Sequence, residues 1–206
     1  SLIVSKEWLT NNEFKHESLR DKIFITDNSI IKKISSLSTP SSIIGVFKLP
    51  EEKKVEVLRQ ELYLVLDGIQ DPGNLGTIIR TADWFGIHQI FASHNTADVF
   101  NPKTIQSTMG SLKRVRVNYT SLSSLFEAYS EMPVYGLMLD GRDIYKSSLK
   151  NYGFIVMGNE GNGISDEMRK YITTPLLIPP YKVSSHGESL NVAIATAITL
   201  SRFRFG

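Results

Sequence analysis

Short apolar runs alternate with helical patterns from residue 61 to the end of the chain, and this alternation limits the possible folds more than any other feature. Strands are predicted at 62–66, 87–92, 134–139, 154–157 and 176–178. Helices are predicted at 73–85, 103–109, 122–129, 166–170 and 190–203, and the last is apolar on all sides and expected to be buried. Such alternation predicts an α/β protein with a mostly parallel sheet and helices on both faces. Ligands of such sheets bind in the loops beyond the carboxyl ends of the strands.

The first 58 residues are interpreted as a separate, smaller α/β unit. A strand at 23–26, a helix at 28–34 and a strand at 43–47 are predicted there. A charged stretch after Pro50 separates this unit from the rest. We therefore expect two domains, 1–58 and 59–206, and the first is expected to be the later part of a small domain whose front part is missing.

Composition excludes several classes of protein. The 206 residues have a formal net charge of +2, so a nucleic acid would have to bind a local basic patch. The absence of cysteine excludes disulfides, thiolate zinc sites, iron–sulfur clusters and cysteine nucleophiles. The four histidines are scattered along the sequence, so their spacing does not indicate a structural metal site. No apolar stretch approaches the roughly 20 residues of a membrane span, and no leader is recognised, so a soluble cytoplasmic protein is expected.

Three loops have unusual sequences, and the first joins the strand at 62–66 to the next helix. It is rich in Asp, Pro and Gly, and a helix N-terminus of this kind suits an anion such as phosphate. Asn74 and Arg80 lie six residues apart on that helix, a spacing that does not align them, so we expect them to face different walls of a site. Alone, the loop is equally compatible with a turn, a helix cap and a surface arginine.

The second loop, Gly158-Asn159-Glu160-Gly161, follows the strand at 154–157. Its glycines let a ligand approach the backbone closely. Their order is the reverse of the dinucleotide-binding fingerprint, and no Lys-Ser/Thr follows as in a Walker A loop. Glu160, taken alone, is more typical of a cap or an ion pair than of a catalytic base.

The third loop leads from the strand at 176–178 into the last helix. Ser189 is predicted to be the N-cap of that helix. Asn191 would then lie in the first turn of an apolar helix, where its amide needs a hydrogen-bond partner.

Together and in this order, the three loops resemble the SpoU/TrmH-type members of the SPOUT class of S-adenosylmethionine-dependent RNA methyltransferases. The matching motifs are Asn74…Arg80, Gly158-Asn159-Glu160-Gly161 and Ser189-Leu190-Asn191-Val192. The resemblance covers about residues 61–206. Residues 1–59 resemble, more loosely, the later part of the ribosomal-protein-like substrate (RNA)-binding domain that many members have.

The resemblance implies a fold, a reaction and a set of site residues. The fold ends in a C-terminal trefoil knot, and the reaction transfers a methyl group from S-adenosylmethionine to a ribose 2′-hydroxyl of RNA, without a metal. Arg80 is expected at the 2′-hydroxyl. The residues implied to position the nucleotide and to hold Arg80 are Asn74, Glu160, Ser189 and Asn191. The residues implied to line the cofactor pocket are Leu139, Gly158, Ile178 and Leu190.

Arg80 is a poor proton acceptor, because a guanidinium group is effectively always protonated in proteins. We therefore expect it to stabilise the developing alkoxide or a nearby phosphate. One segment departs from the family pattern: the loop from Pro180 to Glu188 is longer than usual, and Pro180 stands where a Met is usual. Its His186 is expected to be solvated rather than catalytic.

Family members are homodimers whose sites draw on both subunits, so Arg80 is expected to act across an interface. RNA contact requires neutralisation of phosphates. The basic residues considered for it are Lys113, Arg114 and Arg116, and then Arg142, Lys146 and Lys150. Trp84, Phe85 and Phe100 are expected in the core or the dimer interface rather than in stacks with bases.

Ribosomal RNA is favoured over transfer RNA as the substrate, because the extra N-terminal domain is commoner among the enzymes that act on ribosomal RNA. Two other interpretations stay open. One is a non-catalytic RNA-binding protein that keeps the fold. The other is an unrelated α/β enzyme with a nucleotide or nicotinamide cofactor.

Overall fold

The computed structural model describes residues 1–12, 21–35, 37, 39–51, 55–181 and 189–206. The chain divides into two compact units, Ser1–Lys54 and Val55–Gly206. Among the described residues, no helix combines the length and the apolar character needed to cross a lipid bilayer.

The first unit is a three-stranded sheet in the order β2-β1-β3. The central strand β1 (Leu2–Ser5) runs parallel to β2 (Ile23–Thr26) and antiparallel to β3 (Ile43–Gly45). Helix α1 (Lys6–Asn11) follows β1, and α2 (Asn28–Ile34) follows β2. The strand β1 and the helix α1 are not predicted from the sequence, because α1 follows β1 directly and no Gly or Pro marks the boundary between them.

The second unit is built on a six-stranded sheet in the order β6-β5-β4-β8-β7-β9. Every neighbouring pair of strands is parallel, as the alternating sequence pattern predicts. The strands are β4 (Leu62–Asp67), β5 (Gln89–Ala92), β6 (Arg116–Tyr119), β7 (Val134–Asp143), β8 (Gly153–Gly158) and β9 (Thr174–Leu177).

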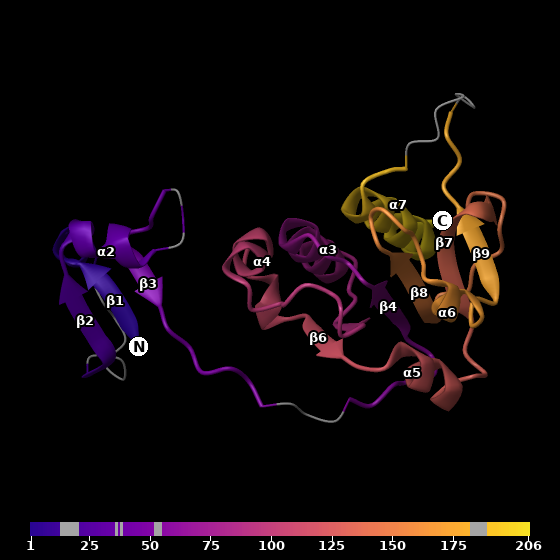
Figure 1. Cartoon of the computed structure of the whole chain (residues 1–206), viewed down its shortest axis with the longest axis horizontal. Helices are drawn as coiled ribbons and strands as arrows, with labels where there is room; N and C mark the ends of the chain where they lie inside the picture. Colours follow the sequence, from indigo (N-terminus) through magenta and orange to yellow (C-terminus); the bar gives the residue numbers. More distant parts are fainter. Residues whose placement is uncertain (13–20, 36, 38, 52–54, 182–188) are drawn as a thin grey trace. The chain divides into compact units, whose positions relative to one another are not determined.

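Helices cover both faces of this sheet (Figure 1). The helices of one face are α3 (Pro72–Trp84), α4 (Pro102–Ser107) and α7 (Val192–Phe205), and those of the other are α5 (Leu122–Ala128) and α6 (Asp166–Arg169). A short 3-10 helix, η2 (Ser111–Lys113), lies between α4 and β6. The mostly parallel, doubly covered sheet predicted from the sequence is confirmed.

The central strand β4 shows why the sheet is buried on both sides. Leu62, Leu64 and Leu66 pack against α3 and α7, whereas Tyr63 and Val65 pack against the cluster beneath α5 and α6. Since successive side chains of a strand point to opposite faces, a run that is apolar throughout fills two cores at once.

Strand β7 departs from regular pairing beside the last helix. Its ladder with β9 shifts between Leu137 and Arg142, and Gly141 lies so close to the backbone of Leu176 that a Cβ there would meet it at 2.4 Å. From α7, Arg202 Nε donates a hydrogen bond to the carbonyl of Ile144 at 3.2 Å. The trefoil knot that the family resemblance implies for this region stays a prediction.

The last helix is less buried than its sequence predicts. Leu200 is fully buried, but Ile194 is 55% exposed. The prediction of burial on all sides is therefore wrong. Helix α7 covers the sheet with one face and leaves a partly apolar face uncovered.

Candidate active site

The three loops meet beyond the carboxyl ends of β4 and β8, the two central strands of the sheet. Strand β4 ends at Asp67, and helix α3 begins at Pro72 after a turn that contains Gly68. Asp71 caps α3, because its Oδ1 accepts a hydrogen bond from the backbone N–H of Asn74 at 2.7 Å. This cap fixes the first turn of the helix, on which Asn74 lies.

Asn159 ties the second loop to the first. Its Nδ2 donates to the carbonyl of Gly68 at 2.7 Å, and its Oδ1 accepts from the backbone N–H groups of Gly161 and Asn162. Asp67, which is almost buried, accepts a further hydrogen bond from the N–H of Ser165 at 2.7 Å. Asn159 and Asp67 hold the glycine-rich loop in place, a role that no pattern in the sequence marks.

Three of the predicted catalytic residues form one hydrogen-bonded chain. Asn191 Nδ2 donates to Asn74 Oδ1 at 3.0 Å, and Asn74 Nδ2 donates to Glu160 Oε1 at 3.0 Å. The backbone N–H of Gln70 reaches the other carboxylate oxygen of Glu160 at 3.5 Å. Residues that lie 86 and 117 positions apart in the sequence are thus joined through a single amide.

Asn191, and not Ser189, caps the last helix. Its Oδ1 accepts from the backbone N–H groups of Ala193 and Ile194, at 2.9 and 3.3 Å. The predicted N-cap at Ser189 is wrong because helical backbone begins only at Val192, and Ser189 lies exposed before it. The N–H groups of Ala193 and Ile194 are therefore hydrogen-bond partners of the Asn191 side chain, and they fix the orientation of its amide group.

The structure does not bring Arg80 into this chain of hydrogen bonds. Six residues of helix turn its side chain about 120° away from that of Asn74. Arg80 is exposed on the outer side of α3, and among the described residues it has no hydrogen-bond or ion-pair partner. Within one subunit, Asn74 and Arg80 therefore face different walls, as their spacing predicts.

An ion pair supports the start of α3. Lys103 Nζ lies 2.8 Å from Asp71 Oδ2, and the hydrogen bond from Lys103 lowers the pKa of the Asp71 carboxyl. Lys103 is on the first turn of α4, so this contact joins two helices beside the site. No pattern in the sequence marks this pair, because its members are 32 residues apart.

The predicted cofactor residues lie at the carboxyl edge of three adjacent strands and at the start of α7. Leu139 in β7 is 73% exposed, and Leu190, which precedes α7, is half exposed. Ile178 directly follows β9, and Gly158 ends β8. A Cβ at Gly158 would lie 2.2 Å from the backbone of Gly163 and Ile164, because the loop folds back onto it. Uncovered apolar side chains beside closely packed backbone fit the adenosine part of S-adenosylmethionine.

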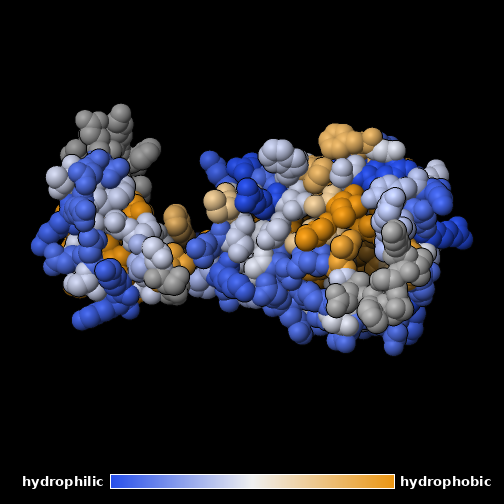
Figure 2. All heavy atoms as spheres, turned by 90° about the horizontal axis from the view of Figure 1, so that it is seen from above, coloured by the Kyte–Doolittle hydropathy of each residue, from blue (hydrophilic) through white to orange (hydrophobic). Residues whose placement is uncertain are grey.

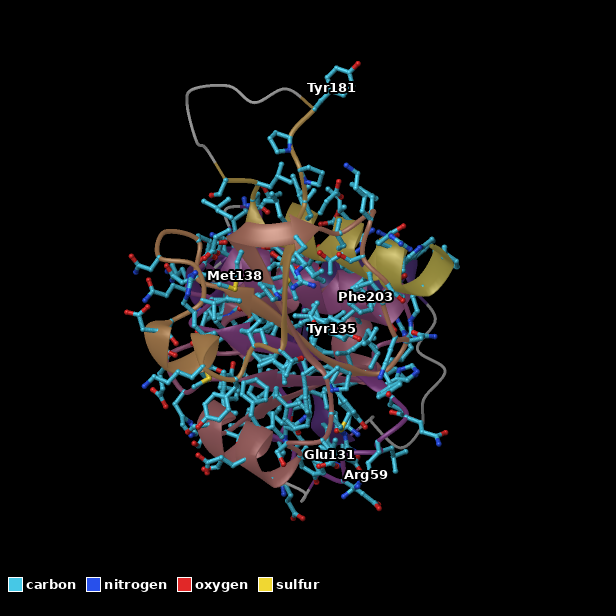
Figure 3. The ribbon with its side chains drawn as sticks, turned by 90° about the vertical axis from the view of Figure 1, so that its right-hand side faces the viewer. Arg59, Glu131, Tyr135, Met138, Tyr181 and Phe203 are labelled. Atoms are coloured by element: carbon cyan, nitrogen blue, oxygen red, sulfur yellow. The ribbon has the colours of Figure 1, made fainter. Side chains whose placement is uncertain are left out.

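The long third loop begins at the same edge. Tyr181 is 99% exposed and stands away from the body of the unit, at the end opposite to the ion pair of Arg59 with Glu131 (Figure 3). The expectation that His186 is solvated concerns a residue outside the described part of the chain.

Several basic residues considered for RNA contact have acidic or aromatic partners. Arg114 forms a two-pronged ion pair with Asp83, with nitrogen–oxygen distances of 2.6 to 3.0 Å. Lys146 lies 3.5 Å from Asp143, and Lys150 lies over the ring of Tyr152. Within the described ranges, no group of three or more His, Asp or Glu side chains is arranged to hold a metal ion.

Comparison with known proteins gives a consistent result. The sequence pattern of the SpoU rRNA Methylase family matches residues 61–201. The 23S rRNA (guanosine(2553)-2′-O)-methyltransferase RlmP of Bacillus subtilis (strain 168) is 33% identical to this chain. The alignment covers 98% of this chain and 81% of the relative. The 23S rRNA (guanosine-2′-O-)-methyltransferase RlmB of Neisseria meningitidis serogroup B is 28% identical, and the alignment covers 89% of this chain and 76% of the relative.

Solved structures agree in fold. A putative RNA methyltransferase of the TrmH family from Porphyromonas gingivalis superposes with a TM-score of 0.82 at 40% identity, over 98% of this chain and 81% of that one. The AdoMet-bound rRNA methyltransferase from Sinorhizobium meliloti superposes with a TM-score of 0.78 at 30% identity, over 88% of this chain and 71% of that one.

Proposed function

The chain belongs to the SpoU rRNA Methylase family, and we propose that it transfers the methyl group of S-adenosylmethionine to a ribose 2′-hydroxyl of ribosomal RNA through the site described above. The named relatives that methylate 23S rRNA at a 2′-oxygen support this substrate, as does the AdoMet-bound relative for the cofactor. The cytoplasm is the compartment we propose for this reaction, since the two named relatives that methylate 23S rRNA are bacterial.

The observation that carries the proposal is the chain of hydrogen bonds from Asn191 through Asn74 to Glu160. It joins the three family motifs at the sheet edge where parallel α/β proteins bind ligands. Its members are exposed or half-buried, so a nucleotide can reach them. A purely structural role would not require three polar groups to converge on an open surface.

Positioning supplies much of the rate enhancement in such a reaction, because the hydroxyl, the methyl group and the leaving sulfur must lie in line. S-adenosylmethionine, when bound, supplies an electrophilic methyl group. Leu139, Gly158, Ile178 and Leu190 hold the adenosine end, while Asn74, Glu160, Ser189 and Asn191 orient the target nucleotide. Arg80 stabilises the negative charge that develops on the 2′-oxygen, because its guanidinium group stays protonated and cannot accept the proton.

The active form we propose is a homodimer joined through the layer of α3 and α7. Hydrophobic side chains gather on this side of the larger unit (Figure 2). Trp84 and Phe205 are both more than 80% exposed, and a groove of about 520 Å³ beside α7 is lined in part by Ile198 and Phe205. Arg80 lies one helical turn from Trp84 on the same outer face of α3. This placement suits an arginine that serves the site of the partner subunit.

Mixed dimers test the role of Arg80 across the interface. When Arg80→Ala and Asn74→Ala chains are combined, a site that uses Arg80 of the partner regains one intact copy in every mixed dimer. We expect methyl transfer well above that of either variant alone. A mixture no more active than its parents would show that Arg80 acts within its own subunit.

The first unit, residues 1–54, is proposed to contact the RNA. Lys32 and Lys33 lie exposed in the last turn of α2 and are available to phosphates. Replacing both with Ala should weaken RNA binding and reduce its dependence on salt, while leaving cofactor binding unchanged.

Calorimetric titration with S-adenosylhomocysteine, combined with a methyl-transfer assay on ribosomal and transfer RNA, tests the whole proposal. Binding of one molecule per subunit with transfer to ribosomal RNA is the expected result. Binding of RNA without binding of S-adenosylhomocysteine would instead support a non-catalytic RNA-binding protein.

A further inference from the structure

A second wall of the site is formed by the loop between β5 and α4. Ser93 Oγ accepts a hydrogen bond from the N–H of Gly68 at 2.8 Å, and Thr96 Oγ1 donates to the carbonyl of Leu66 at 3.3 Å. The N–H of Ala97 donates to the carbonyl of Ile69 at 2.8 Å. These bonds fix the β5–α4 loop against the turn that leads to Asn74.

Asn95 lies at the exposed tip of this fixed loop. Its side-chain nitrogen, carbon and oxygen lie 3.1, 3.7 and 3.8 Å from the point where a Cβ on Gly68 would stand, so the amide lies against the Gly68 backbone. Gly68 has a φ of +73°, which favours glycine at this contact. On its other side, the carbonyl of Gly68 accepts the hydrogen bond from Asn159, the neighbour of Glu160.

The Asn95 amide is held in place and remains available for binding. Asn95 is exposed, and among the described residues its side chain has no hydrogen-bond partner. An asparagine amide offers two donors and one acceptor in a plane, which matches a donor and an acceptor side by side on the edge of an unstacked base.

We infer that Asn95 contacts the base of the nucleotide whose ribose is methylated, and that it thereby contributes to the choice of nucleotide. The inference rests on the proposed function, because it places the ribose at Asn74 and Glu160. Asn95 is then the exposed amide next to this site, because Gly68 contacts both the Asn95 amide and Asn159, the neighbour of Glu160. The ligand class is a single unpaired nucleotide of RNA.

Four RNA fragments that differ only in the methylated nucleotide test this inference. The wild-type chain is expected to discriminate among them. Asn95→Ala should lower kcat/KM on the preferred RNA by about tenfold, as expected for the loss of a two-point contact with a base edge, and should reduce the discrimination. Asn95→Asp should shift preference toward guanosine, whose edge offers two adjacent donors to a carboxylate. Affinity for S-adenosylhomocysteine should not change in either variant.

His94→Ala is the matched control, because His94 is exposed on the same loop and has no assigned role. It should keep the wild-type preference. If Asn95→Ala keeps the same preference and the same kcat/KM as the wild type, the inference is wrong and the proposed function stands. If the wild-type chain methylates none of the four fragments, the proposed function and this inference fail together.

Discussion

Asn74 Oδ1 accepts a hydrogen bond from Asn191 Nδ2 at 3.0 Å, and this contact sets the direction of the whole site network. The Asn191 oxygen is already used to cap α7, so its amide nitrogen must face Asn74. Asn74 must then present its oxygen to Asn191 and its nitrogen to Glu160. Glu160 therefore serves as the acceptor in both of its hydrogen bonds.

Two substitutions at Asn191 separate its two functions. Asn191→Ala loses the cap and should lower the free energy of unfolding by about 1 kcal/mol. Asn191→Asp keeps a good cap and should stay within about 0.5 kcal/mol of the wild type. Both lose the donor to Asn74, so both should reduce methyl transfer by about tenfold or more.

Denaturant unfolding and single-turnover methyl transfer, measured on the same preparations, check this pair. If Asn191→Asp unfolds like the wild type and also transfers methyl groups at the wild-type rate, the hydrogen bond from Asn191 to Asn74 does not contribute to methyl transfer.

Gly158 and Gly161 provide a second matched pair. A Cβ at Gly158 would lie 2.2 Å from backbone atoms, whereas at Gly161 the nearest atom is 3.6 Å away. Gly158→Ala must displace the loop, so we expect at least about tenfold weaker binding of S-adenosylhomocysteine, which corresponds to about 1.4 kcal/mol. Gly161→Ala should bind within about twofold of the wild type. Equal affinities of the two variants in a calorimetric titration would show that the loop does not shape the cofactor pocket.

The two supports of the start of α3 should differ in strength. Asp71→Ala removes the N-cap together with the ion pair to Lys103 and should lower the free energy of unfolding by about 1 kcal/mol or more. Lys103→Ala removes only an exposed ion pair and should cost less than about 0.5 kcal/mol. Urea denaturation of both variants checks the order, and a larger loss for Lys103→Ala would contradict it.

Asp83 gives a pH-dependent contribution to stability. Hydrogen bonds from Arg114 hold the pKa of the Asp83 carboxyl below its ordinary value of 3.8. Near that pH, the unfolded chain binds more protons than the folded one, so this contribution is present above pH 3.8 and is lost as the pH falls through the lower pKa of the folded state. Asp83→Asn should be less stable than the wild type at neutral pH, and the difference should close in acid. Unfolding curves at several pH values with a constant difference would contradict this assignment.

The sequence predicts the central sheet well because its strands are short apolar runs between helices of clear period. It also identifies Asn74, Glu160 and Asn191 as polar residues in apolar or glycine-rich surroundings. It misplaces the cap of α7, since Ser189 and Asn191 are both good capping residues and only the backbone shows where the helix begins. It does not show the Lys103–Asp71 pair or the position of Asn95, because these contacts join residues that no local pattern relates.

The most direct test of the account is the identity of the methylated atom. The chain is incubated with ribosomal RNA and S-adenosylmethionine that has a labelled methyl group, and the digested nucleosides are separated and analysed by mass spectrometry. We predict label on the ribose 2′-oxygen of one nucleotide, with loss of the signal in Arg80→Ala at unchanged affinity for S-adenosylhomocysteine. Label on a base, or a full ribose signal from the Arg80→Ala variant, would contradict the account.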